Sequence, residues 1–144
     1  MNKQLQLLKD FQDEVNKTNS KNDKLVTIKK MDSPTLREFF KYLYSYDIKF
    51  YVTSDVCKKK SELISIGQYE DIFELLSDLN ARKITGHDSI KAINGFIDAN
   101  AEYEELIYQI IDRDIKCGID ESSVNKAIPN LIPTFDVALA NKFD

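Results

Sequence analysis

Apolar residues recur three or four positions apart through most of this 144-residue chain, and this spacing is its most constraining feature. In residues 4–15 they fall at Leu5, Leu8, Phe11 and Val15, while charged side chains take most positions between them. Because the period matches the 3.6 residues of a helical turn, each such segment predicts an amphipathic helix with one buried face. We therefore expect an all-α fold, a compact bundle of about six or seven helices.

Residues that start or stop helices divide the chain into segments. Ser33-Pro34 is a start signal, because serine can cap the first turn and proline is tolerated at the first helical position. The expected helices are residues 4–15, 21–31, 34–51, 67–79, 86–97, 101–111 and a last one after residue 120, with residues 53–67 as a connection. In the second of these, Leu25, Val26 and Ile28 are expected to face inward.

The third expected helix is rich in aromatic residues, and two interpretations compete for them. Interleaved with lysines, such rings can stack on the bases of single-stranded nucleic acid. Aromatic residues at helical spacing more often build the core of a small domain, so we expect core packing and place Phe40 in it. The residues are Phe39, Phe40, Tyr42, Tyr44, Tyr46, Phe50 and Tyr51.

Composition is typical of a soluble globular domain, with 42% hydrophobic and 31% charged residues. Apolar runs are too short to span a membrane, so we expect a cytoplasmic protein, of a bacterium or of a phage-infected host. Cys57 and Cys117 lack the paired spacing of a zinc site, and we expect reduced, partly buried thiols without a bound metal. The single histidine, His87, has no partner residues for catalysis in the sequence pattern.

Charge is unevenly distributed along the chain. The formal net charge is −4, but residues 1–60 carry a net +5 and residues 61–144 a net −9. Because a binding face depends on local charge, the acidic total does not exclude a nucleic-acid partner. It also permits an alternative, a stand-alone helical protein-interaction module that docks a basic partner through the acidic residues of 70–78 or 102–105. The lysine run 58–60 permits either a phosphate contact or a solvated loop.

Two glycine turns join expected helices, and cations lie beside both. At Gly118, Asp120 can cap the following helix by accepting from the amide of Ser122 or Ser123, while the remaining amides at that helix start attract a phosphate. At Gly86 the same order of cations, glycine and helix start recurs. The candidate DNA-binding residues are Arg113, Lys116, Gly118, Asp120, Ser122 and Ser123 at the first corner, and Arg82, Lys83, Thr85 and Gly86 at the second. We expect the two corners to lie on helices packed together. In the absence of any further signal, each such corner would be only a way of packing two helices.

Three strings in the last third of the chain resemble a known family. They are RDIKCG at residues 113–118, VNK at 124–126 and PNLIP at 129–133. Together they resemble the end of the N-terminal DNA-binding domain of ATP-dependent DNA ligases, most of all the ligases of T-even bacteriophages. In that family Lys116 and Gly118 match a basic residue and a glycine that contact the minor groove.

The resemblance implies a function and a domain organisation. Residues 1–133 would be a helical domain that binds nicked double-stranded DNA without sequence specificity, in an enzyme that seals nicks in replication, repair and recombination. Residues 134–144 would be a connector toward a nucleotidyltransferase domain, which works with an OB-fold domain of the same, monomeric enzyme. ATP and Mg²⁺ would serve that full-length enzyme and not this chain.

Catalytic motifs are missing from the sequence. The family's lysine-x-aspartate-glycine string, which carries the adenylylated lysine, does not occur in it. Neither a phosphate-binding glycine loop nor a nucleophile elbow is present. We expect the chain to be inactive in ligation by itself.

Overall fold

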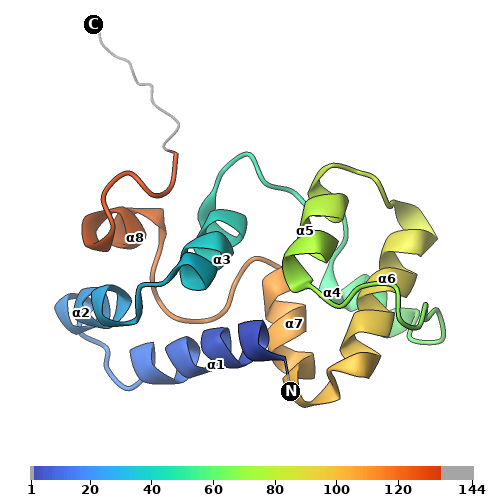
Figure 1. Ribbon diagram of the computed structural model, residues 1–144, viewed down its shortest axis with the longest axis horizontal. Helices are drawn as coiled ribbons and strands as arrows, with labels where there is room; N and C mark the ends of the chain where they lie inside the picture. Colours follow the sequence, from blue (N-terminus) through green and yellow to red (C-terminus); the bar gives the residue numbers. More distant parts are fainter. Residues whose placement is uncertain (1, 134–144) are drawn as a thin grey trace, which may run out of the picture.

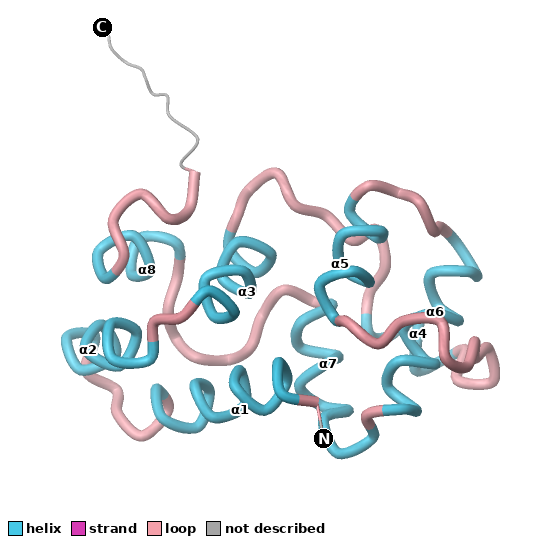
Figure 2. Tube along the Cα trace, in the orientation of Figure 1, coloured by secondary structure: helices cyan, strands magenta, loops and turns pink. Residues whose placement is uncertain are grey.

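Helices make up the regular structure of residues 2–133, the part that the computed structural model describes (Figures 1 and 2). This confirms the all-α prediction. The helices are α1 (Lys3–Val15), α2 (Lys21–Met31), α3 (Pro34–Tyr44), α4 (Ser54–Lys59), α5 (Ile72–Asn80), α6 (Gly86–Ala99), the 3₁₀ turn η1 (Ala101–Tyr103), α7 (Glu104–Ile111) and α8 (Glu121–Ala127). The expected connector, residues 134–144, lies outside the described residues.

Capping side chains set where most of these helices begin. Ser33 Oγ accepts from the amide of Leu36 at 3.1 Å, and Pro34 takes the first helical position, as predicted. Ser20 caps α2 in the same manner, accepting from the amide of Asp23. Such bonds satisfy amides that have no partner within the first helical turn. The sequence therefore locates these helix starts by local chemistry.

The aromatic helix α3 is shorter than expected, because it ends at Tyr44 and not near residue 51. The side chain of Arg113 lies at this end and donates to the carbonyls of Tyr42, Ser45 and Ile48. It thereby supplies partners to carbonyls that a continued helix would have bonded itself. Residues 45–53 follow as an irregular segment.

A short helix, α4, occupies part of the expected connection between residues 53 and 67. Asp112, at the end of α7, accepts from the amide of Ser54 at 2.9 Å and from its hydroxyl at 2.5 Å. On the other side, the Asn94 side-chain amide donates to the carbonyls of Cys57, Lys60 and Leu63. The segment is thus held by α6 and α7, and the expected connection contains a short helix that was not predicted.

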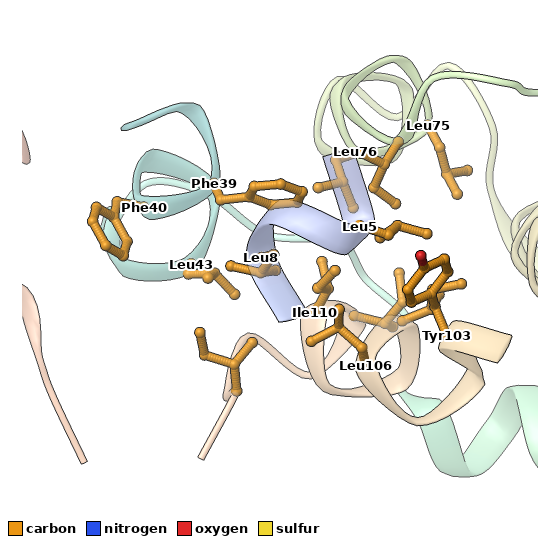
Figure 3. Packing of buried hydrophobic residues seen from close by; sticks show 14 of the residues in the cluster. Leu5, Leu8, Phe39, Phe40, Leu43, Leu75, Leu76, Tyr103, Leu106 and Ile110 are labelled. Carbon is orange, nitrogen blue, oxygen red and sulfur yellow. The ribbon is translucent and has the colours of Figure 1, made fainter. Parts of the chain in front are cut away.

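The core joins α1, α3, α5 and α7 (Figure 3). Figure 3 shows Leu5 and Leu8 of α1 among side chains of the other three helices. Phe40 is fully buried and meets Phe11 edge to face, with ring centroids 5.4 Å apart. The core interpretation of the aromatic segment is therefore confirmed at Phe40, although Tyr46 and Tyr51 beyond α3 are more than half exposed.

The buried face of α2 differs from the expected one. Val26 is 62% exposed, whereas Lys24 is only 8% exposed. The helix packs on α1 and α8, and this geometry turns Lys24 toward the segment that precedes α8. The expectation that Val26 faces inward is wrong, and a charged residue takes the inward place.

Both cysteines are free thiols and both are buried. Burial raises the pKa of Cys57 to about 11 and that of Cys117 to about 12, so both stay protonated at neutral pH. Among residues 2–133, no group of three or more His, Cys, Asp or Glu side chains is placed to hold a metal ion. Within the same residues, no helix has the length and apolar character needed to cross a membrane.

Candidate nucleic-acid interface

The Gly118 corner is the loop from the end of α7 to the start of α8. Gly118 is exposed and has φ +66°, a left-handed conformation that glycine adopts without strain. Asp120 Oδ1 accepts from the Ser123 amide at 2.9 Å and from the Ser123 hydroxyl at 3.1 Å. The predicted cap is therefore confirmed, with Ser123 as its partner, while Ser122 is exposed.

This cap changes what the start of α8 can bind. The Ser123 amide bond, more than any other interaction, holds the pKa of the Asp120 carboxyl below its usual range, so a negative charge stands there at neutral pH. Glu121 adds a second carboxylate in the first turn. An approaching phosphate would meet these two charges and an amide that is already bonded. Asp120 thus acts as the predicted cap, and the two carboxylates weigh against a phosphate at the start of α8.

Arg113 belongs to the interior of the fold and not to the exposed corner. Its guanidinium is half-buried, and burial lowers the pKa of the group. Three of its nitrogens donate to backbone carbonyls of residues 42–48. We therefore leave Arg113 out of the candidate interface.

Lys116 is the exposed cation of this corner, as predicted. Its backbone amide and its ammonium both donate to Asp114, at 3.0 and 3.2 Å, with the amide bond contributing most to the lowered pKa of Asp114. The two side chains are 69% and 59% exposed. Exposed ion pairs of this kind contribute little to stability, so the Lys116 ammonium can exchange Asp114 for a phosphate at small cost.

Two cations of α2 lie beside the corner, and reasoning from the sequence missed both. Lys24 Nζ donates to the Cys117 carbonyl at 2.6 Å, and Lys21 is close enough to Asp120 to help lower its pKa. The one local signal is that the two lysines stand three positions apart, so they share a face of α2. That signal is weak, because the same spacing is common on solvated helices.

The Gly86 corner is an exposed, cationic turn. Arg82, Lys83, Thr85 and Gly86 are all exposed, and Gly86 opens α6 with φ +55°. Thr85 precedes α6 without a capping side-chain bond. The Arg82 guanidinium carbon lies 4.2 Å from the centroid of the exposed Tyr51 ring, a cation–π contact that orients the guanidinium without using its N–H donors.

The two corners do not form one site. Helix α8 packs on α2, whereas α6 packs on α4, α5 and α7. Figure 1 places α8 and α6 toward opposite ends of the long axis of the molecule. The expectation of helices packed together holds for α6 and α7, but the starts of α6 and α8, which the two corners lead into, lie apart. A partner that contacts both corners must extend along the long axis.

The lysine run 58–60 forms the exposed end of α4 and the residue after it. Lys58 Nζ lies 4.6 Å from the Tyr108 ring centroid, so this ammonium stands over an aromatic face.

Comparison with known proteins finds sequence similarity to two DNA ligases. No family model matches the chain. It is 25% identical over 130 aligned residues to the DNA ligase of Enterobacteria phage T4 and, at the same identity and length, to that of Enterobacteria phage T6. The chain is similar to phage DNA ligases. The alignments cover 87% of this chain but 26% of each ligase, so it spans about a quarter of the length of these curated relatives.

Proposed function

We propose that this chain is the DNA-binding domain of a ligase-like protein and holds nicked double-stranded DNA for sealing, as the N-terminal domain of an ATP-dependent DNA ligase. The observation that carries the proposal is the Gly118 corner, where an exposed lysine and an exposed left-handed glycine follow each other within three residues. The similarity to phage DNA ligases supports the same assignment. In this proposal the domain comprises residues 1–133.

Contacts of this type favour the sugar-phosphate backbone over base edges. The Lys116 ammonium is a point charge suited to a phosphate oxygen, and a glycine lets the backbone of the protein approach a sugar closely. Neither group reads a donor and acceptor pattern, so binding should be independent of sequence. Few cations take part, and the affinity of the isolated domain should be modest, with a shallow salt dependence.

The shape of the candidate interface supports an extended partner. Arg82 and Lys83 provide a second cationic point just before α6, and Figure 1 places α6 toward the opposite end of the molecule from α8. In this proposal a duplex lies along the long axis and contacts both points, whereas a small anion would contact one. We therefore assign the Gly86 corner to phosphates at a distance along the same duplex, with minor-groove contact centred on Gly118.

Sealing chemistry is assigned to parts of the enzyme outside this chain. The described residues form no cluster that fits a metal ion, and the sequence has no lysine-x-aspartate-glycine string. ATP, Mg²⁺ and the covalent steps would belong to a nucleotidyltransferase domain, with an OB-fold domain completing the enzyme. Replication, repair and recombination in the cytoplasm of a phage-infected host are the processes that such an enzyme would serve.

The test is a binding titration with a labelled nicked duplex at low salt, read by fluorescence anisotropy. Lys116→Glu should weaken binding by about tenfold or more, because it replaces an attractive charge by a repulsive one at a phosphate. Lys3→Glu is the matched control, since it makes the same charge change at the exposed start of α1. Equal affinity of the two variants would remove the Gly118 corner from the proposal.

The interaction module is a second candidate, favoured by exposed acidic residues. Glu102, Glu104 and Glu105 are exposed together on η1 and α7. If the wild-type chain fails to bind nicked duplex at low salt, a basic protein partner on this surface becomes the better assignment.

A further inference from the structure

Lys24 places a buried positive charge directly behind the Gly118 corner. The residue is 8% exposed and its ammonium donates to the Cys117 carbonyl at 2.6 Å. Among the residues that the structure describes, no carboxylate lies within 4.0 Å of it. An ammonium has three donors, and a buried charge without a counter-ion is costly. One carbonyl does not compensate it.

The Gly118 position controls access to this ammonium. A Cβ built on Gly118 would lie 2.8 Å from Lys24 Nζ, closer than any ordinary carbon contact. Any other residue would thus either cover the ammonium or push it aside. Because Gly118 is exposed, the absent side chain leaves the ammonium within reach of a group that contacts the glycine from outside.

We infer that Lys24 is a phosphate-binding residue: a DNA backbone phosphate seated against Gly118 accepts a hydrogen bond from the Lys24 ammonium and completes its missing counter-charge. This inference rests on the proposed function and adds a residue to it. Lys116 stands on the solvent side of the same phosphate, which is held between the two cations.

Burial makes Lys24 the stronger of the two contacts. Lys116 is largely exposed and already shares its charge with Asp114, whereas Lys24 is shielded from water and held in place by α2 and α8. Charge-assisted bonds are stronger where the local dielectric is low. An anion at the Gly118 corner is repelled by the carboxylates of Asp114, Asp120 and Glu121. A phosphate therefore stays bound there only with a positive charge as effective as that of Lys24.

A purely structural role for Lys24 makes a different prediction. In that case the bond to Cys117 only ties α2 to the loop, and removing it changes stability alone. Salt dependence separates the two roles, because each lysine–phosphate contact adds about one to the slope of log affinity against log salt. A structural lysine adds nothing to this slope.

The decisive variant is Lys24→Met, which keeps most of the side-chain stem and removes the charge. We expect about a tenfold loss of affinity for nicked duplex at low salt, and a salt slope reduced by about one, in protein shown to be folded by circular dichroism. Unchanged affinity and slope in the folded variant would overturn the inference while leaving the proposed function standing. If the wild-type chain does not bind nicked duplex, the proposed function is refuted, and this inference with it.

Gly118→Asn tests the same contact without touching Lys24. Asparagine tolerates positive φ better than most residues, so the loop is kept, while its Cβ covers the ammonium. The expected result is a salt slope reduced by about one in the wild-type background and no further loss of affinity in the Lys24→Met background. Independent, additive losses would contradict a shared phosphate. If Lys24→Met does not fold, the salt slope of Gly118→Asn in the wild-type background is the test, and an unchanged slope would overturn the inference.

Discussion

Replacing Arg113 by methionine should destabilise the domain without touching its proposed DNA contacts. The Arg113 side chain spans three backbone carbonyls, with Nε 2.9 Å from the Tyr42 carbonyl, Nη1 2.5 Å from the Ile48 carbonyl and Nη2 bonded to the Ser45 carbonyl. Methionine keeps much of the apolar stem and removes all three bonds. The C-terminal end of α3 then loses its partners.

The expected loss is roughly 3 to 5 kcal/mol of the free energy of unfolding. Hydrogen bonds to a charged group contribute about 1.5 to 3 kcal/mol each, and the lower end applies because two of the three carbonyls belong to the half-buried Tyr42 and Ile48 and regain some water. Domains of this size are stable by about 5 to 15 kcal/mol in total. Arg113→Met should therefore lower the melting temperature markedly.

Urea unfolding followed by circular dichroism measures this loss, with Arg37→Met as the matched control. Arg37 also makes a double contact, to Asp32 at 2.7 Å through both Nε and Nη2, but on the exposed surface. Removing an exposed pair should cost less than about 1 kcal/mol. Equal losses in the two variants would refute the reasoning. A reduced DNA affinity of folded Arg113→Met would instead return this residue to the interface.

Two further predictions concern single contacts. Gly95→Ala should destabilise the domain by roughly 2 kcal/mol or more in thermal melts, because the new Cβ would lie 1.7 Å from the Ser65 carbonyl oxygen; a raised melting temperature, the usual result of Gly→Ala in a helix, would contradict this contact. Asp120→Ala should cost about 1 kcal/mol as a lost cap near neutral pH. Because folding lowers the pKa of Asp120, its contribution is full above about pH 4 and is lost as the pH falls through the folded pKa, so wild type and variant should converge in acid; a difference independent of pH would argue against the charged cap.

The starts of α2, α3 and α8 were predictable because their chemistry is local, whereas α5 begins at Ile72 and not at the predicted residue 67. Serine or aspartate at the cap positions and a proline at the first helical position determine where α2, α3 and α8 begin, and α2 has the bounds predicted for it. The end of α3 was not predictable. It depends on Arg113, which lies 65 to 71 positions away along the chain. Six-residue α4 likewise depends on side chains from α6 and α7.

The same contrast between local and long-range causes applies to the residues of the candidate interface. The sequence predicted a glycine turn at residue 118 with Lys116 beside it, and the structure has this turn in the left-handed conformation and Lys116 exposed. Whether a charged side chain stays at the surface depends on what packs over it, and this cannot be read from neighbouring residues. For this reason Arg113 was predicted at the interface although the fold half-buries it, and Lys24 was not predicted.

The fold also accounts for how an acidic segment can receive DNA. Residues 61–144 carry a net −9, yet both candidate corners lie within this half of the chain. Packing of α2 against α8 brings Lys21 and Lys24, from the half with net +5, to the Gly118 corner. Positive charge is therefore assembled by tertiary contact, and it exists only in the folded domain. It follows that DNA should stabilise the folded state through α2 and α8 together, so added nicked duplex should raise the melting temperature of the wild type, and should raise it less in Lys24→Met.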